Sequence, residues 1–363
     1  TWTIINDDSA TATVVAGADG KDGGKPEGNP PTGSIADFTV TLSAPSATDT
    51  TIYYHTVNGT ATTGDSDYTG VTSGSIVIAA GATTGVIHVP VTGDLKVEPN
   101  ENFTLVLDST SNANIGVNTT PATWTIINDD SATATASVEM QGGGLAEGNP
   151  PFGSTADFTV TLSAPSSTAT TIYYHTTNGS ATTGDSDYTG VVSGSIVIAA
   201  GATTGVIHVP VTGDLAIEGN ETFNVVLDST SNANIGVNTT PATWTIINDD
   251  SATATVVAGA GGQDGGAPEG NPPTGSTAQF TVTLSAPSAT ATTIYYHTTN
   301  GSATTGDSDY TGVISGSIVI AAGATTGVIS VPVTGDLTIE GNENFNVVLD
   351  STSNANIGVN TTP

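Results

Sequence analysis

The chain of 363 residues has no cysteine and no arginine, and its only basic side chains besides five histidines are three lysines. Against these stand 34 aspartates and glutamates, so the formal net charge is −31. Nucleic acids and anionic membrane surfaces are recognised by clusters of lysine and arginine, so we expect neither as a partner. The lack of cysteine also excludes a disulfide framework and thiolate chemistry.

Long apolar runs are missing too. No window approaches the roughly 18 consecutive apolar residues of a membrane-spanning helix, so we expect no membrane insertion. The first residues, Thr1-Trp2-Thr3, include neither an initiator Met nor a signal-peptide pattern, which predicts a processed product or a section of a longer protein. Hydrophobic residues make up only 36% of the chain, but threonine, serine, glycine and β-branched residues are abundant. This composition is typical of a folded all-β protein with small cores.

The sequence repeats itself with a period of about 120 residues, which suits whole domains in tandem better than a solenoid. The segment Trp-Thr-Ile-Ile-Asn-Asp-Asp-Ser-Ala-Thr begins at Trp2, Trp124 and Trp244. We therefore predict four segments: 1–8 as the last strand of a preceding repeat, 9–130 as the first repeat, 131–250 as the second repeat, and 251–363 as a third repeat that lacks its last strand.

Each repeat contains short β-branched segments with alternating apolar residues, separated by Gly, Asn, Asp and Pro. In the first repeat we expect strands at Ala10–Val15, Ala36–Leu42, Thr51–Thr56, Ser75–Ile78, Val86–Val91, Phe103–Leu107 and Thr123–Ile127. Seven such strands predict an immunoglobulin-like sandwich. The fold class is thus all-β, with three tandem seven-stranded immunoglobulin-like antiparallel β-sandwiches. The linker Asn128–Ser131 has no Gly or Pro, so we expect the sandwiches to lie end to end.

Most of the acidic residues recur, because 27 of the 34 occupy nine positions that are found in all three periods. In the first period these are Glu27, Asp65, Asp67, Asp94, Glu98, Glu101, Asp108, Asp129 and Asp130. Asp108 follows the sixth predicted strand, where we expect it to form a turn at the opposite end. The others fall in alternate connections, which share one end of an antiparallel sandwich. Carboxylates crowded there without cationic partners would raise one another's pKa values, and a hard divalent cation would remove that repulsion.

Calcium is the cation that suits such a site best, because it accepts six to eight oxygen ligands in loose geometry from several loops. Magnesium demands a stricter octahedron, and zinc prefers Cys and His. The recurring His55, His175 and His297 lie within predicted strands, away from the acidic loops.

The motifs and their order resemble those of the Calx-beta domain, a calcium-binding sandwich found in sodium/calcium exchangers, integrin β4 and bacterial surface proteins. The resemblance rests on Glu27-Gly28-Asn29, Phe38–Leu42, Asn58–Tyr68, Val89–Asp94, Glu101-Asn102-Phe103 and Ile126–Asp130. It covers nearly the whole of each period. Asn128 and Gly93 stand where calcium-rich members have acids, so the resemblance implies fewer ions per site here.

The resemblance further implies which acids bind calcium, at the end of each sandwich where the next repeat attaches. These are Glu27, Asp67, Asp94, Glu98, Glu101, Asp129 and Asp130 in the first repeat; Glu147, Asp187, Asp214, Glu218, Glu221, Asp249 and Asp250 in the second; and Glu269, Asp309, Asp336, Glu340 and Glu343 in the third. We expect Asp7 and Asp8 to complete the site of a preceding repeat. Either the chain is part of a longer covalent array or separate chains exchange the Trp strand.

We expect no enzyme, because no nucleophile elbow, phosphate loop or acid pair beside an aromatic platform is present. The function predicted first is structural: an extracellular, cell-surface or secreted stalk, adhesin shaft or filament stiffened by calcium. Its partners would be neighbouring copies of the repeat, other fibres or a host cell surface. Two alternatives remain open. One is an adhesive module that binds through the Gly-rich loops Gly17–Gly28 and Gln141–Gly148, and the other is a calcium-sensing regulatory array.

Overall fold

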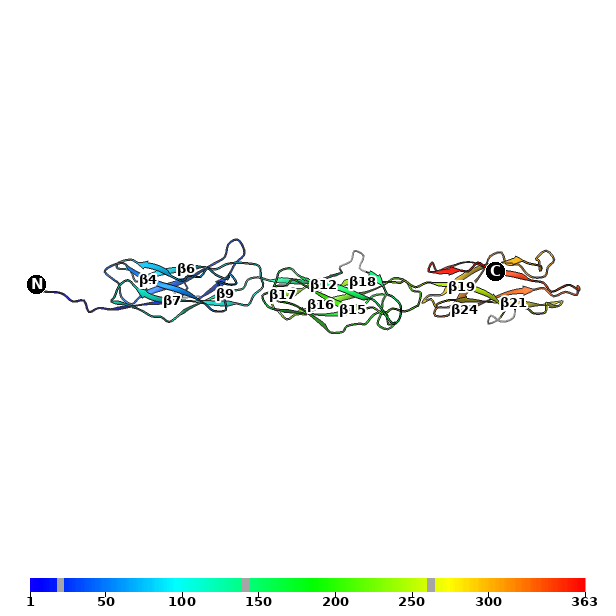
Figure 1. The fold of residues 1–363 in the computed structure, drawn as a ribbon, viewed down its shortest axis with the longest axis horizontal. Helices are drawn as coiled ribbons and strands as arrows, with labels where there is room; N and C mark the ends of the chain where they lie inside the picture. Colours follow the sequence, from blue (N-terminus) through cyan, green and yellow to red (C-terminus); the bar gives the residue numbers. More distant parts are fainter. Residues whose placement is uncertain (18–22, 139–143, 260–264, 363) are drawn as a thin grey trace.

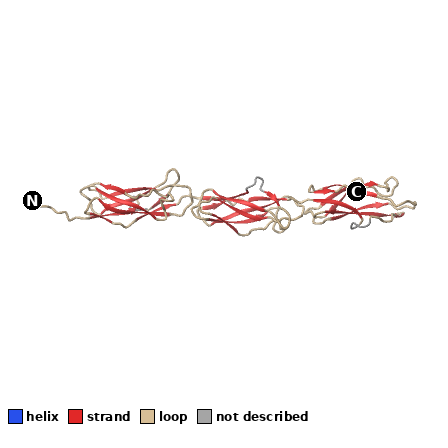
Figure 2. Ribbon diagram, in the orientation of Figure 1, coloured by secondary structure: helices blue, strands red, loops and turns tan. Residues whose placement is uncertain are grey.

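The computed structural model describes residues 1–17, 23–138, 144–259 and 265–362. Within these ranges the protein is all-β, and no helix is present that is long and apolar enough to cross a membrane (Figure 2). The Gly-rich stretches Gly17–Gly28 and Gln141–Gly148 lie partly outside the described residues. Their described parts include short strands, so these stretches are not surface loops throughout.

All seven strands expected in the first repeat are present, and two three-residue strands join them. The strands are β1 (Ala10–Ala16), β2 (Gly24–Pro26), β3 (Ile35–Leu42), β4 (Thr50–Asn58), β5 (Gly74–Ile78), β6 (Thr84–Pro90), β7 (Glu101–Thr110), β8 (Ile115–Val117) and β9 (Ala122–Ile127). They form two facing sheets, ordered β6-β3-β1-β8 and β2-β9-β7-β4-β5. The short strands β8 and β2 pair in parallel with β1 and β9, and the remaining pairs of the two sheets are antiparallel.

The second repeat has the same order of strands and sheets. Its strands are β10 (Ala132–Val138), β11 (Gly144–Ala146), β12 (Thr155–Leu162), β13 (Thr170–Asn178), β14 (Gly194–Ile198), β15 (Thr204–Pro210), β16 (Glu221–Thr230), β17 (Ile235–Val237) and β18 (Ala242–Ile247). The third repeat consists of β19 (Ala252–Ala258), β20 (Gly270–Asn271), β21 (Thr274–Leu284), β22 (Thr292–Asn300), β23 (Gly316–Ile320), β24 (Thr326–Val333), β25 (Phe345–Thr352) and β26 (Ile357–Val359).

Each sandwich encloses its own core, built from the inward-facing residues of alternating strands. In the first repeat Phe38, Phe103 and Trp124 are completely buried. Phe38 packs edge-on against Phe103 with ring centroids 5.9 Å apart and lies 6.0 Å from the Trp124 ring. The tryptophan of the last strand is therefore a core residue.

The third repeat differs at one edge, because no strand corresponding to β9 or β18 follows β26 within the sequence. In the first repeat Glu101 pairs with Ile126 of β9, and β7 begins at Glu101. In the third repeat β25 begins only at Phe345, two positions later in the repeat, and the second sheet has three strands instead of five. The missing partner strand explains this later start, since a strand needs a hydrogen-bonded neighbour.

The three sandwiches follow one another along an elongated molecule (Figure 1), as the sequence predicted. The linker Asn128–Ser131 joins β9 directly to β10. A second contact lies beside it, because Val97 from the β6–β7 loop of the first repeat is fully buried in the core of the second. Ile217 likewise belongs to the core of the third repeat.

Candidate metal centre

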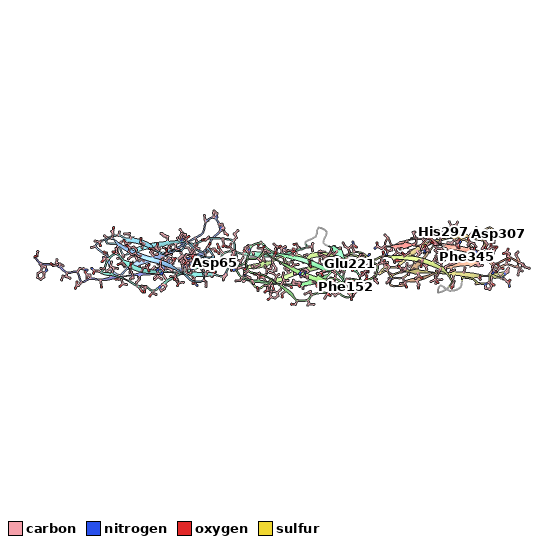
Figure 3. The ribbon with its side chains drawn as sticks, viewed as in Figure 1. Asp65, Phe152, Glu221, His297, Asp307 and Phe345 are labelled. Atoms are coloured by element: carbon pink, nitrogen blue, oxygen red, sulfur yellow. The ribbon has the colours of Figure 1, made fainter. Side chains whose placement is uncertain are left out.

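The predicted ligands lie on loops at the end of each sandwich that faces the next one, where Figure 3 places Asp65 of the first repeat. Alternate connections between the strands return to this end, so residues far apart in sequence meet there. In the first repeat the contributing segments are the residues after β2 (Glu27), after β4 (Asp67), between β6 and β7 (Asp94 and Glu98), at the start of β7 (Glu101) and after β9 (Asp129 and Asp130).

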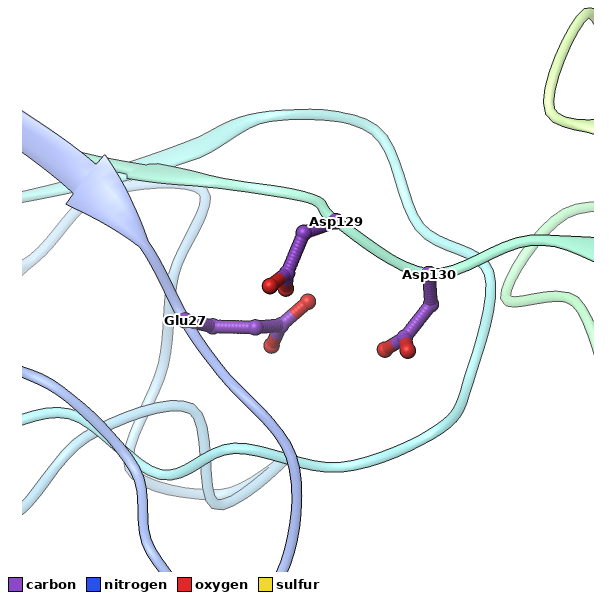
Figure 4. A group of neighbouring side chains, drawn as sticks. All are labelled: Glu27, Asp129 and Asp130. Atoms are coloured by element: carbon purple, nitrogen blue, oxygen red, sulfur yellow. The ribbon is translucent and has the colours of Figure 1, made fainter.

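One group of three carboxylates lies at the linker. Oxygen atoms of Glu27, Asp129 and Asp130 all lie within 4.8 Å of one another, and the side chains point toward a common centre (Figure 4). Glu27 is only 4% exposed and Asp130 only 8%. The Oδ2 atom of Asp130 is buried and has no hydrogen-bond partner among the described residues. A buried carboxylate oxygen without a partner costs free energy unless a cation binds it.

A second group, Asp67, Glu98 and Glu101, lies beside the first, again with oxygen atoms within 4.8 Å of one another. Lys96 also reaches this group, with its Nζ 2.6 Å from Glu98 Oε1. No role was predicted for Lys96, although a lysine between Asp94 and Glu98 is a visible signal in the sequence. It supplies one positive charge to the first site.

The loops hold these carboxylates through local hydrogen bonds. The backbone N–H of Thr62 donates to Asp67 Oδ2 over 2.6 Å, in a turn whose Ser66 has a positive φ of 72°. That conformation is uncommon for a residue with a Cβ, and it recurs at the equivalent serines of the other repeats. At the linker, the N–H of Gly28 donates to Asp129 Oδ1 over 3.2 Å.

Asn128 occupies the position where the sequence analysis noted a missing acid, and it organises the linker instead. Its Oδ1 accepts a hydrogen bond from the backbone N–H of Glu98, and its Nδ2 donates to the carbonyl of Asp130. One amide side chain thus connects the β6–β7 loop to the linker.

Burial, and after it the crowding of like charges, raises the pKa values of several acids in the site. Burial raises the pKa of Glu27 to about 8, and the carboxylates of Asp94, Asp130 and Glu98 add to this shift. Burial and the neighbouring Asp67 raise the pKa of Glu101 to about 7. The site without a cation therefore holds protons near neutral pH, as expected for carboxylates that share a confined space.

The second repeat reproduces this arrangement. Its two outer groups are Glu147 with Asp249 and Asp250, and Asp187 with Glu218 and Glu221. A further group, Glu147, Asp214 and Glu218, connects them into one continuous cluster. Burial raises the pKa of Glu147 to about 8, followed by the charges of Asp214 and Glu218. Among the residues that the structure describes, Asp250 Oδ2 is buried and has no hydrogen-bond partner, like its counterpart in Asp130.

The third repeat presents its acids differently. Glu269, Asp309, Glu340 and Glu343 line an open groove. Glu269 is exposed, in contrast to the buried Glu27 and Glu147. The pKa of Glu340 is raised by desolvation and by the charges of Asp336, Asp309 and Glu269, so these carboxylates remain electrostatic neighbours. Asp7 and Asp8 lie on the exposed N-terminal segment.

Asp108 does not form the turn that was predicted for it. It lies within β7, and its Oδ1 is 2.7 Å from Nδ1 of His55 on the neighbouring strand β4. The same pair recurs as His175 with Asp228 and as His297 with Asp350. These histidines belong to the sheet surface, so the donor set of each cluster consists of oxygen atoms. Such a set suits a hard divalent cation.

Comparison with known proteins identifies the family. The profile of the Calx-beta domain matches residues 32–130, 153–250 and 274–362. No curated protein matches the sequence. Among solved structures, CBD12 from CALX1.2 is similar at 16% identity and a TM-score of 0.30, over 65% of this chain and 99% of that chain.

Two further solved structures are similar over different lengths. The apo-form Calx CBD1 domain matches at 22% identity and a TM-score of 0.27, over 32% of this chain and 98% of that chain. A structure of a 1.5-MDa bacterial ice-binding adhesin matches at 15% identity and a TM-score of 0.25, over 97% of this chain and 98% of that chain. Since the family profile matches most of the sequence in three successive regions, the chain belongs to the Calx-beta domain family.

Proposed function

We propose that the protein is an extracellular structural protein, in which calcium stiffens a tandem-repeat stalk, adhesin shaft or surface filament without catalysis. The observation that supports this most is the position of Asp130. Its carboxylate is 8% exposed and has an unpartnered oxygen within the described structure, and it stands two residues before β10 of the next repeat. A cation bound there would hold the linker to the loops of the first repeat.

Calcium is the proposed ion because each cluster offers several carboxylates from separate loops and no nitrogen or sulfur donor. Calcium accommodates such irregular oxygen cages, whereas magnesium retains its water and demands a strict octahedron. The proposed ligands are the acids that the family resemblance implied in each repeat, with Asp7 and Asp8 completing the site of a preceding repeat. The millimolar calcium outside cells would fill sites even of low affinity, which favours a cell-surface or secreted location.

The β6–β7 loop carries both an acidic residue of the cluster and the residue that contacts the next repeat. Calcium binding to this loop would therefore stiffen the array. Val97 is buried in the second repeat, and its neighbour Glu98 belongs to the acidic cluster of the first. Fixing Glu98 through a cation would fix Val97, so both connections between the sandwiches would become rigid together. The partners we propose are neighbouring copies of the same repeat, joined covalently or by strand exchange.

Limited proteolysis tests the proposal. Calcium should protect the linkers 128–131 and 248–251, and a chelator should expose them to a nonspecific protease. Magnesium at the same concentration is the matched control and should protect much less. The double variant Asp130→Asn with Asp250→Asn should be cleaved at these linkers even in calcium. Equal cleavage rates with and without calcium would refute the proposal.

A further inference from the structure

Each repeat contains one long segment without a charged side chain, although the formal net charge of the chain is −31. The segments are residues 69–93, 189–213 and 311–335, and they contain no Asp, Glu, Lys or Arg. In the first repeat the segment includes β5 and β6, which are edge strands of the two facing sheets. A Cβ atom added at Gly85 of β6 would lie 2.9 Å from Ile76 of β5, so the two edges meet at one side of the sandwich.

The edge strand β5 lacks the features that protect a sheet edge from pairing with another chain. Such features are a very short strand, proline and charged side chains. The strand β2 is three residues long and includes Lys25 and Pro26, and β8 also has three residues. The strand β6 ends at Pro90 and carries His88, whose ring nitrogen lies 2.7 Å from Asp37. By contrast, β5 has the sequence Gly-Ser-Ile-Val-Ile, and among the described strands it pairs with β4 alone.

The outward-facing side chains beside this edge are apolar in every repeat. A valine of the edge strand is more than half exposed: 57% at Val77 in β5, 64% at Val197 in β14 and 65% at Val319 in β23. A tyrosine on the neighbouring strand is 42% exposed in all three repeats, as Tyr53, Tyr173 and Tyr295. Apolar side chains that gather at the same unpaired edge in each repeat are typical of an interaction surface.

We propose that two copies of this chain associate side by side through the edge strands β5, β14 and β23, each of which adds to the sheet of the other copy. The added strand runs antiparallel, as β4 does to β5, so a two-fold axis relates the two copies. With Ile76 or its equivalent on that axis, Val77 of one copy lies beside Ser75 of the other. The strands run along the molecule (Figure 2), so the two copies lie alongside each other in opposite directions.

The distribution of charge favours a second copy as the occupant. An acidic partner is repelled by a chain of net charge −31, and a basic partner is attracted to the acidic clusters instead of to neutral edges. A second copy is equally acidic, so it can approach closely only where both surfaces are neutral. In the first repeat Asp49 reaches this side and accepts a hydrogen bond from the N–H of Ala80, but Ala169 and Ala291 replace it in the other repeats.

The regular spacing of the edges also favours a second copy. The two junctions between repeats use equivalent β-bridges, Val97 with Ser166 and Ile217 with Ser288. The step from one edge strand to the next is therefore the same at both junctions, and another copy has the same step. When one pair of edge strands aligns, its neighbours align too. Strand pairs that would each be weak alone then act together, as in other multivalent contacts.

Sedimentation velocity of the 363-residue chain over a range of concentrations tests the proposal. The measurement is made in chelator with low salt and in chelator with about 1 M sodium chloride, which shortens the Debye length to about 3 Å. We expect dimers that become more stable in high salt, because the contact is apolar and the acids outside it repel each other. Monomers at all concentrations and salt levels would overturn the proposal, and so would dimers that form only in calcium. Calcium protection of the linkers is measured separately, so either proposal can fail without the other.

Like charges placed on the edges should prevent association. The triple variant Val77→Glu, Val197→Glu and Val319→Glu should weaken dimerisation by more than about tenfold, because like charges then face each other across the contact. The control is the triple variant Val15→Glu, Phe152→Glu and Val257→Glu, whose sites are 46%, 78% and 48% exposed and lie outside the edge strands. It adds the same charge and should dimerise like the parent chain in high salt. Equal losses in both variants would contradict the assignment of the edges.

Cross-linking locates the contact without altering its apolar residues. The chain has no cysteine, so Ser195→Cys introduces one thiol on β14, and Ser137→Cys introduces one on the outer face of β10 as a matched control. Both serines are exposed. A short bismaleimide should join Ser195→Cys chains into covalent dimers much faster than Ser137→Cys chains. Equal cross-linking of the two variants, or none in either, would overturn the proposal.

Discussion

The backbone of Val97 in the first repeat pairs with the backbone of Ser166 in the second through a parallel β-bridge. Val97 is completely buried there, and Ser166 is 1% exposed. The residue that follows Val97 is Glu98, a member of the acidic cluster. A covalent linker and a noncovalent bridge therefore join the two sandwiches, and the acidic cluster lies between them.

The β-bridge between Ile217 and Ser288 at the second junction predicts that a substitution of Ile217 lowers the stability of the third repeat and exposes the linker before it. Replacing Ile217 by Ala removes a buried side chain from the core of the third repeat, so the free energy of unfolding of that repeat should fall by about 2 kcal/mol. Cleavage of the linker 248–251 should also accelerate. Calorimetry and limited proteolysis measure the two effects. Ile314→Ala is the control, because Ile314 is 95% exposed and should leave both unchanged.

Asp130→Asn should have opposite effects on binding and on the stability of the cation-free protein. The amide is a weaker ligand, so we expect the calcium affinity of the first site to fall by at least about tenfold, or about 1.4 kcal/mol. Without calcium the variant should melt higher than the parent, because one buried like charge has been removed. Titration calorimetry and thermal melts in chelator measure these effects.

Asp108→Asn is the matched control for Asp130→Asn. Asp108 recurs in every repeat as the cluster acids do, but it pairs with His55 on the sheet surface. Its replacement should leave calcium affinity unchanged and cost less than about 1 kcal/mol of stability, because the contact with His55 is solvent-exposed. Equal losses of affinity in both variants would show that the cluster is not the binding site.

Lys96 predicts a difference between the first two sites. Its ammonium lies 2.6 Å from Glu98 in the first repeat, whereas the second repeat has Ala216 at that position. A fixed positive charge opposes a divalent cation, so Lys96→Ala should raise the affinity of the first site by about tenfold. Lys25→Ala, which removes a lysine paired with Asp37, should have a much smaller effect. Calcium titrations in which Lys96→Ala leaves the first site unchanged would contradict this account.

The raised pKa values predict how stability varies with pH. In the folded, cation-free protein the pKa of Glu27 and Glu147 is about 8, above the ordinary value of 4.5. The folded state therefore binds more protons than the unfolded state between these values, so the stability present at low pH is lost as the pH rises through about 8. Thermal melts in chelator should show a falling midpoint from about pH 5 to about pH 9.

Calcium should abolish the dependence of the melting midpoint on pH, because the ionised carboxylates then bind the ion. Calcium binding at pH 7 should also release protons from the site. The double variant Glu27→Gln with Glu147→Gln should show a flatter profile in chelator. A parent protein whose melting midpoint does not change over this range would contradict the electrostatic description of the site.

The sequence predicted the long strands because their alternation is strong, as in Phe38–Leu42. It did not predict β2 and β8, because Gly24–Pro26 and Ile115–Val117 are short and contain Gly or Pro, which usually indicate loops. The turn expected at Asp108 was wrong because β7 continues to Thr110, with an irregularity opposite Tyr53 and Tyr54 that preserves its pairing with β4.

The clustering of the acids could be predicted from the order of the loops, since alternate connections of a sandwich share one end. The contact of Val97 with the next repeat could not. Val97 stands between charged residues in a loop that contains Pro99, so nothing local distinguishes it from a solvated side chain. Its burial arises from the second repeat, and only the three-dimensional arrangement of both repeats reveals it.

The central claim is that calcium at the junctions stiffens the array, and small-angle X-ray scattering tests it most directly. The parent chain is measured in calcium and in chelator, with magnesium as the control cation. We predict a single long maximum dimension in calcium, and a shorter, broader distance distribution in chelator because the sandwiches then reorient. Scattering curves that coincide in calcium and in chelator, while calorimetry shows the ion bound, would contradict the claim.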